Sequence, residues 1–395
     1  MRYPEYVAKV INKLEENRFE AYIVGGSVRD MLLGKEPNDY DVTTSARPEK
    51  TLEIFSDMRT IPTGLKHGTV TVMSDGNPIE VTTFRVDGEY LDSRRPESVS
   101  FTSSISDDLS RRDFTVNAMA YSEKRGVIDL FGGREDLERQ IIRAVGDPKK
   151  RFSEDALRIM RAFRFSSQLG FDIDKATLDG ACEMREGLAK IAAERIAAEF
   201  IRTICTNTPH TSLELMAEKG IFEFITGGYI PKPEVLSALE RSPRLAHIRL
   251  GIFLSDAEKE QARQILRGLK LSNKLVSDSL RISAGVSEQL AGTDADARRF
   301  IGKHGELSPD ILDAASALGR LDEDFLERVN KAISEKSCAT GGSLALNGGD
   351  LVKLGAKGRE VGELLSYLLE RVIEEPELNE KQALLAIARK HLDKS

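Results

Sequence analysis

The sequence has few cysteines, few histidines and no long apolar run, and each scarcity excludes a class of protein. Its 395 residues include three cysteines that form no CxxC pair, which argues against a zinc site or a disulfide framework. No apolar stretch approaches the ~20 residues that a membrane-spanning helix needs. The five histidines are scattered and no His-Asp dipeptide occurs, which argues against a metal phosphohydrolase of the histidine–aspartate type.

The first twenty residues, MRYPEYVAKVINKLEENRFE, have the pattern of an amphipathic helix and lack the apolar core of a signal peptide. With few cysteines and no membrane segment, we expect a cytoplasmic protein with no membrane partner.

The overall charge is acidic, with a formal net charge of −7 at pH 7. Such a balance ordinarily counts against a nucleic-acid partner, because binding phosphates needs positive charge. The segment 134–164 differs, since it holds nine Lys and Arg against six Asp and Glu, a local balance of +3. The sequence therefore leaves room for a basic groove on an acidic protein.

Strands and helices alternate up to about residue 133, and the strand signal then disappears. The length predicts two to four domains. We predict the fold class α+β: a head with a small mixed sheet, followed by an all-α neck, body and tail. The predicted domains are 1–137, 138–205, 206–290 and 291–395. Predicted strands are AYIV, DYDVTT, GTVTVM, IEVTTFR and GVIDL, and predicted head helices are 3–17, 27–33, 47–56 and 113–120.

Two carboxylates flank one tyrosine in the DYDVTT stretch. In a strand, residues two apart point to the same face, so Asp39 and Asp41 are expected to project together with Tyr40 turned away. Two adjacent carboxylates repel unless a cation lies between them, and Mg²⁺ bridged to substrate phosphates is the natural candidate. An isolated DxD is common, and a pair of surface aspartates is the alternative.

A glycine pair precedes these carboxylates. Gly25 and Gly26 follow an apolar strand and open the segment SVRDMLL. Backbone N–H groups at such a strand-to-helix turn bind anions, and Arg29 lies in the first turn where it can reach a phosphate. A phosphate cradle next to a metal pair is what nucleotide chemistry needs.

A third acid, Glu80, belongs to the strand that ends in Arg85. It can complete the carboxylate cluster or position an attacking hydroxyl. An ion pair with Arg85 is an equally good interpretation.

The segment DDLSRRDFTVNAMA combines basic and polar residues before an apolar stretch. An arginine at a helix start is unfavourable unless an anion is near, so Arg112 is predicted to contact a triphosphate. Asp113 and Asn117 are four apart and share one face of the predicted helix. Asp113 can accept a hydrogen bond from a ribose hydroxyl, and a solvent-exposed turn is the alternative.

The stretch EDALRIMRAFR places one acid and three arginines at intervals of three: Asp155, Arg158, Arg161 and Arg164. On a helix these side chains cover a stripe of ~120°. An ordinary ion pair between Asp155 and Arg158 is the alternative, but it leaves two arginines unexplained.

An Asp beside an Arg matches the Watson–Crick edge of two bases. Cytosine and adenine both present an amino donor next to a ring-nitrogen acceptor, and a carboxylate accepts where a guanidinium donates. Uracil and guanine present the opposite order. The pair Asp155 and Arg158 is therefore predicted to select CTP and ATP, with Arg161 and Arg164 as further contacts to nucleotide or RNA.

These segments together resemble a known family. GGSVRDMLLG, the DYD strand, IEVTTFR, RRDFTVNAMA, IDLFGG and EDALRIMRAFRF, in this order, are similar to the motifs of class II tRNA nucleotidyltransferases. These are the bacterial and eukaryotic CCA-adding enzymes and their poly(A) polymerase relatives. The motifs cover about residues 1–205. The segment GGDLVKLGAKGREVGELLSYLLERV also resembles the C-terminal part of Firmicute-type CCA-adding enzymes.

The resemblance implies that the chain adds CCA to the 3′ end of tRNA without a nucleic-acid template, by attack of the 3′-hydroxyl on the α-phosphate of CTP or ATP. It implies a catalytic head with Mg²⁺, a neck that selects the base, and a tail that binds the acceptor arm and T-arm. The polar segment 85–101, with Asp92, Arg94 and Arg95, has the length of the loop that supports complete CCA addition. A CC-adding or A-adding enzyme, a poly(A) polymerase and an inactive RNA-binding scaffold stay as alternatives, and a homodimer stays open.

Overall fold

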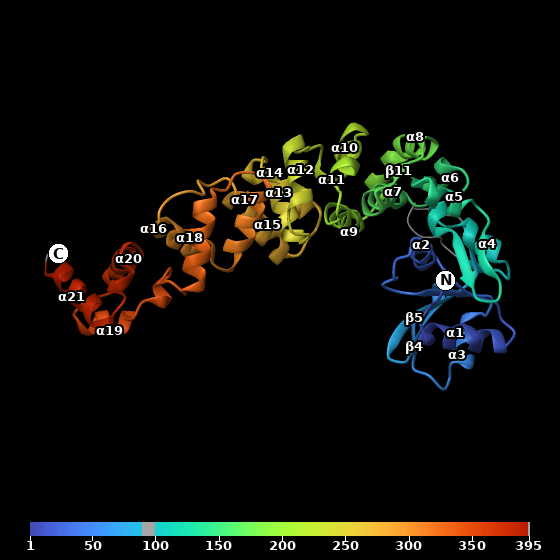
Figure 1. Cartoon of the computed structure of the whole chain (residues 1–395), viewed down its shortest axis with the longest axis horizontal. Helices are drawn as coiled ribbons and strands as arrows, with labels where there is room; N and C mark the ends of the chain where they lie inside the picture. The colour runs from blue at the N-terminus through green and yellow to red at the C-terminus, as the bar shows by residue number, and fades with distance from the viewer. Residues whose placement is uncertain (89–98, 394–395) are drawn as a thin grey trace. The chain divides into compact units, whose positions relative to one another are not determined.

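The computed structural model describes residues 1–88 and 99–393 and divides the chain into two compact units. The first unit contains residues 1–230 and 268–270, and the second contains residues 231–267 and 271–395. Figure 1 shows the chain coloured by residue number. The four domains expected from the sequence stay predictions, and each unit is described by itself below.

A seven-stranded mixed sheet forms the centre of the first unit, in the order β3-β4-β5-β2-β1-β8-β9. Strands β2 and β5 pair in parallel and the other neighbours are antiparallel. A separate hairpin joins β6 and β7. The bounds are β1 (Ala21–Val24), β2 (Asp41–Thr44), β3 (Thr60–Gly64), β4 (Thr69–Ser74), β5 (Asn77–Thr83), β6 (Arg85–Asp87), β7 (Val99–Phe101), β8 (Met119–Ser122) and β9 (Gly126–Asp129).

Short helices cover this sheet. Helix α1 (Glu5–Glu16) buries its apolar stripe and packs against β1 and β4, beside α3 (Pro48–Ile54), as Figure 1 shows. Tyr22 and Val24 of β1 pack with Leu109 of α4 (Ile105–Ser110) in a buried cluster. The remaining head elements are α2 (Gly26–Leu32), η1 (Leu65–His67), η2 (Thr115–Asn117) and α5 (Gly133–Glu138).

The helix predicted over 113–120 was wrong. Residues 115–117 form the single 3-10 turn η2, and the following residues continue as strand β8. Strand β8 is buried along its whole length between β1 and β9, so pairing in the sheet decided its conformation over any local preference.

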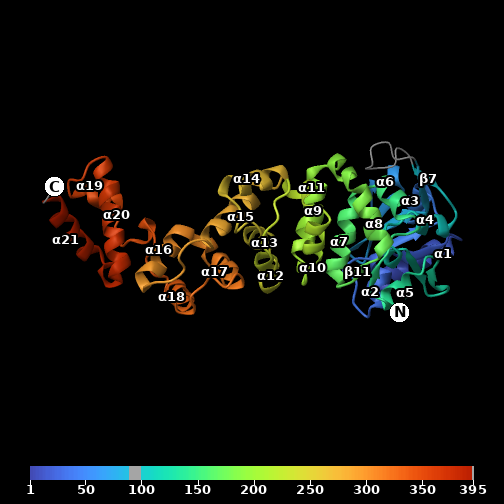
Figure 2. The same ribbon diagram turned by 90° about the horizontal axis from the view of Figure 1, so that it is seen from above.

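Helices dominate after the head, with one small exception to the expected all-α neck: β10 (Ile141–Ile142) and β11 (Asp172–Ile173) pair in parallel. Helix α7 packs against α9 and α10, as Figure 2 also shows. The bounds are α6 (Pro148–Glu154), α7 (Leu157–Leu169), α8 (Lys175–Met184), η3 (Arg185–Lys190), α9 (Ala193–Ile204), α10 (His210–Glu218) and α11 (Glu223–Thr226).

The second unit is helical throughout the part that the structure describes. Its last helices share a core around Leu351, Leu368 and Leu384. No helix in residues 1–88 or 99–393 is long and apolar enough to cross a membrane. The bounds are α12 (Pro233–Arg241), α13 (Ala246–Phe253), α14 (Lys259–Gly268), α15 (Asn273–Gly285), α16 (Asp294–His304), η4 (Gly305–Leu307), α17 (Ser308–Ala317), α18 (Glu323–Ser334), η5 (Gly341–Ser343), α19 (Gly348–Lys353), α20 (Arg359–Glu374), η6 (Pro376–Leu378) and α21 (Lys381–Leu392).

Candidate active site

Three acidic residues meet where β1 ends and β2 begins. In the strand register, Asp41 lies between Val24 of β1 and Glu80 of β5. The predicted strand DYDVTT includes Asp39, but in the structure β2 begins at Asp41, and Asp39 lies two residues before it. Asp39, Asp41 and Glu80 are all exposed, whereas Tyr40 is buried and packs edge-on against Tyr6. The opposite orientation expected for the tyrosine is therefore confirmed.

Negative charge is crowded at this edge of the sheet. Asp41 as a whole is accessible to solvent, but protein atoms crowd around its carboxyl group, and this desolvation together with the charges of Asp39 and Glu80 raises the pKa of Asp41 to about 6. Arg112 acts in the opposite direction on the same carboxyl. A divalent cation would relieve this repulsion. Within the described residues, no group of three or more His, Cys, Asp and Glu is arranged to hold a metal, so the site rests on the aspartate pair.

The glycine turn lies directly beside these acids, because Gly25 follows Val24. Gly25 has φ +73°, and helix α2 begins at the next residue. A Cβ built on Gly25 would lie 3.0 Å from Nη1 of Arg112. The Nε of Arg112 is buried and has no hydrogen-bond partner among the described residues. A guanidinium with an unsatisfied donor beside a glycine turn is suited to an anion.

Arg29 was expected to contact a phosphate, but in the structure its side chain bonds to neighbouring protein residues. Its side chain is buried, and it donates to Asp30 at 2.8 Å and to Oδ1 of Asn117 at 2.7 Å. Its guanidinium also lies 5.4 Å from the centroid of the Phe165 ring on α7. In this structure Arg29 thus connects the glycine turn to the neck.

Asp113 and Asn117 do lie together, but not on a helix: Asn117 ends the 3-10 turn η2 and Asp113 lies two residues before that turn begins. Asp113 accepts hydrogen bonds from the amide of Phe114 at 2.8 Å, from Asn117 at 3.3 Å and from two nitrogens of Arg161 at 2.8 and 2.5 Å. Burial acts to raise the pKa of Asp113, but Arg161 lowers it to about 2. The carboxylate is therefore ionised and fully engaged within the protein.

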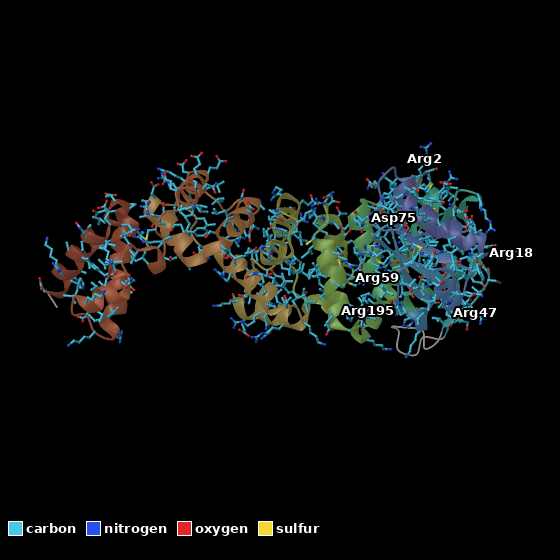
Figure 3. All side chains as sticks on the ribbon, turned by 90° about the horizontal axis from the view of Figure 1, so that it is seen from below. Arg2, Arg18, Arg47, Arg59, Asp75 and Arg195 are labelled. Atoms are coloured by element: carbon cyan, nitrogen blue, oxygen red, sulfur yellow. The ribbon has the colours of Figure 1, made fainter. Side chains whose placement is uncertain are left out.

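The backbone amide of Arg158 donates to the carbonyl of Asp155 at 3.0 Å, but the side chains of these two residues, which were predicted to select the base, have other partners. Asp155 lies in the extended break between α6 and α7, with φ −142°, so it is not part of the helical stripe. It accepts from Arg195 of α9 at 2.9 Å, a residue labelled in Figure 3. Arg158 donates to Glu154 at 2.7 Å and to the carbonyls of Arg151 and Arg111 at 3.0 Å.

The rest of the arginine stripe is also paired with carboxylates. Arg164 is buried and donates to Glu199 of α9 at 2.5 Å, and Arg161 lies 3.9 Å from the same carboxylate. Sequence reasoning missed Glu154, Arg195 and Glu199. Glu154 could have been found, because it lies four residues before Arg158. The two α9 residues gave no local signal.

The segment 85–101 lies largely outside the described residues. Asp92, Arg94 and Arg95 belong to residues 89–98, so the expectation placed on them stays a prediction.

Carboxylates beside a glycine turn at one edge of a mixed sheet, followed by an arginine-rich helix, define a nucleotidyltransferase. The family profile described as "Poly A polymerase head domain" matches residues 21–143. Profiles for a "Probable RNA and SrmB- binding site of polymerase A" and for tRNA nucleotidyltransferase domain 2 match residues 170–234 and 247–388.

Similar proteins share one description. The CCA-adding enzyme of Limosilactobacillus fermentum is 39% identical over 390 residues, which cover 96% of this chain and 95% of that protein. The enzyme of Geobacillus stearothermophilus is 38% identical, with 95% and 94% covered. A crystal structure of the Bacillus stearothermophilus CCA-adding enzyme in complex with CTP matches with a TM-score of 0.86 and 33% identity over 100% of both chains.

The chain therefore belongs to the family of CCA-adding enzymes, the nucleotidyltransferases that extend tRNA without a nucleic-acid template. The Thermotoga maritima CCA-adding enzyme complexed with tRNA shares the fold, with a TM-score of 0.71 at 21% identity over 98% and 96% of the chains. Enzymes of this family need a divalent metal ion.

Proposed function

We propose that this chain builds the complete CCA end of tRNA from CTP and ATP, with Mg²⁺ at the aspartate pair. The observation that carries the proposal is the meeting of Asp41, the Gly25 turn and the unsatisfied Nε of Arg112 at one edge of the sheet. CTP and tRNA in the similar proteins support the same substrates for this chain.

Asp39 and Asp41 would hold Mg²⁺, because carboxylate oxygens are the ligands that this ion prefers, and because the charges of Asp39 and Glu80 add to desolvation in raising the pKa of Asp41. The bound ion neutralises charge on the phosphates and makes the attacking hydroxyl more acidic. Glu80, which lies opposite Asp41 in the strand register, would orient that hydroxyl.

The triphosphate would lie against the backbone of Gly25 and Gly26 and accept hydrogen bonds from Arg112. In the reaction the 3′-oxygen of tRNA bonds to the α-phosphorus, the bond from that phosphorus to the bridging oxygen breaks, and pyrophosphate leaves. The hydroxyl proton is lost to solvent or to a nearby carboxylate. Arg29 would stabilise the glycine turn through its hydrogen bonds to Asp30 and Asn117.

Asp155 and Arg158 would read the base. Three of the five N–H groups of Arg158 have partners, and each carboxylate oxygen of Asp155 accepts one hydrogen bond, from Leu157 and from Arg195. Both side chains therefore keep capacity for the cytosine or adenine edge. Arg161 and Arg164 would support this helix through Asp113 and Glu199, and the ribose contact predicted for Asp113 would compete with Arg161.

The test is extension of three labelled tRNAs, ending at the discriminator base, at C and at CC, with each nucleoside triphosphate separately. Addition of C, C and then A, without U or G, is expected. Addition of only C or only A would assign a partial enzyme, and a run of A residues a poly(A) polymerase. Intact tRNA binding without any addition in Mg²⁺ would favour an RNA-binding scaffold.

A further inference from the structure

Asp108 is a fully buried carboxylate of helix α4 that the proposed function does not use. Its side chain is 0% exposed. An ionised carboxylate is costly to bury unless several hydrogen bonds and opposite charges compensate it. Its partners therefore indicate what it does.

Those partners come from the strand of the metal site and from both adjacent arginines. Oδ1 accepts from Nε and Nη2 of Arg111 at 3.1 and 2.8 Å and from the amide of Arg85 at 3.4 Å. Oδ2 accepts from Nη2 of Arg112 at 3.2 Å and from the hydroxyl of Thr43 at 3.4 Å. Although burial acts to raise it, Arg111 and Arg112 hold the pKa of Asp108 below its ordinary value.

Oδ2 of Asp108 connects to the proposed triphosphate site through Thr43 and Arg112. Thr43 lies two residues after Asp41 in β2, so both side chains leave the strand on the same face. Arg112, anchored to Asp108 through one Nη, has its other Nη beside Gly25 and its Nε unpartnered. Asp108 thus determines where the guanidinium of Arg112 points.

Oδ1 of Asp108 connects, through Arg111, to Arg158 on the helix proposed to select the base. The carbonyl of Arg111 accepts a hydrogen bond at 3.0 Å from Nη2 of Arg158. Because the Arg111 side chain is fixed to Asp108 at two points, the peptide that holds Arg158 is fixed as well. One buried carboxylate therefore connects the strand of Asp41 to Arg158.

We propose that Asp108 is a positioning residue that aims Arg112 at the triphosphate and holds the Arg111 peptide against Arg158, so that phosphate binding and base selection are set together. The inference rests on the proposed function. Nothing in it requires Asp108 to touch substrate.

The first test is Asp108→Asn, which keeps the shape but turns a donor toward two guanidinium groups. We expect KM for CTP and for ATP to rise roughly 10- to 100-fold, the range of a lost charge-assisted hydrogen bond. Inhibition by inorganic tripolyphosphate, a probe with no base, should weaken by a similar factor. Incorporation of UTP relative to CTP should rise, and the Kd for tRNA should stay unchanged.

The matched control is Asp107→Asn, one residue earlier on the same helix. Asp107 accepts from the hydroxyl of Thr102 at 2.8 Å, and no arginine bonds to it in the part of the chain that the structure describes. Its KM values and its tripolyphosphate inhibition should match those of the wild type. Equal effects of both substitutions would overturn the proposal, because they would report general damage to α4.

A double-mutant cycle separates positioning from stability. In an Arg112→Gln background, Asp108→Asn should raise KM for CTP no further, because its effect on phosphate binding passes through Arg112. An equal further rise there, or an unchanged KM in the single variant, would overturn the inference. Either result would leave the proposed function intact if the wild-type chain adds C, C and A.

Arg111→Lys gives a second route if Asp108→Asn does not fold. It keeps the charge but loses the two-point contact, and the expected result is more UTP incorporation with a smaller change in KM. Unchanged discrimination between CTP and UTP in this variant would overturn the link to Arg158.

Discussion

Buried arginines are partnered differently in the two units of the chain. In the first unit each of the four found among the described residues contacts a carboxylate: Arg29, Arg151, Arg158 and Arg164. In the second unit Arg249 donates to the carbonyls of Ser242 and Pro243, and Arg298 donates to the carbonyl of Ile373.

An arginine that pairs with a carbonyl and an arginine that pairs with a carboxylate contribute to the protein in different ways. A carbonyl at a helix end or loop needs a donor, and an arginine that supplies it stabilises the chain locally. A buried ion pair is weak evidence for stability, because desolvation offsets much of its attraction. If Arg158 serves the proposed nucleotide site, its ion pair with Glu154 and that of Arg164 with Glu199 would contribute to the geometry of that site.

The largest expected effect is on activity. Asp39→Ala should lower kcat for C addition by about 10³-fold or more, since the metal site supplies several kcal/mol of transition-state stabilisation. The Kd for tRNA and the thermal midpoint should stay close to those of the wild type, measured by filter binding and by calorimetry.

Asp75→Ala is the control for that substitution. Asp75, labelled in Figure 3, is an acid in the turn between β4 and β5 that pairs with Lys9 at 2.8 Å. Its kcat should be unchanged. Wild-type turnover in Asp39→Ala would remove Asp39 from the metal site.

A large effect on stability should distinguish the two kinds of buried arginine. Glu199→Gln leaves Arg164 without its buried counter-charge and should cost about 3–5 kcal/mol. Arg298→Met removes one buried hydrogen bond to a carbonyl and should cost about 1–2 kcal/mol. Urea unfolding, with hydrogen exchange to localise each loss, measures both. Equal costs would remove the distinction between the units.

An intermediate effect should depend on pH. The depressed pKa of Asp113, about 2 against 3.8, corresponds to roughly 2 kcal/mol of stability. That contribution is complete above about pH 4 and is lost as the pH falls from about 4 toward 2. The stability difference between wild type and Asp113→Asn should thus be constant from pH 7 to 5 and shrink by pH 3. A constant difference over the whole range would contradict the ion pair with Arg161.

The smallest effect is expected at the surface of the second unit. Arg299 on α16 contacts Glu370 and Glu374 of α20, but its side chain is more than a third exposed. Arg299→Ala should cost below about 1 kcal/mol, and the cost should fall further in 1 M salt. If Arg299→Ala lowered the free energy of unfolding as much as Glu199→Gln does, then solvent exposure would not determine how much an ion pair stabilises this protein.

Local chemistry predicted five strands and three helices of the head, and the roles of the candidate site residues stay predictions. The Gly25–Gly26 turn, the exposed aspartates around a buried Tyr40, and the five predicted strands all have local signals, and the structure confirms them with small shifts at their ends. The register that places Asp41 beside Glu80 has no such signal, because it is set by pairing between strands almost forty residues apart.

By itself, the sequence provided the candidate residues for holding a cation, binding a phosphate and matching the edge of cytosine or adenine, since these predictions follow from side-chain chemistry and short-range spacing. Only the tertiary structure decided that residues 119–122 join the sheet, that Arg195 holds Asp155, and that Glu199 pairs with Arg164. Each of these depends on a strand pair or a buried charge pair whose members are brought together by packing. Local propensity is weak beside the cost of leaving a backbone group or a charge unsatisfied in the interior.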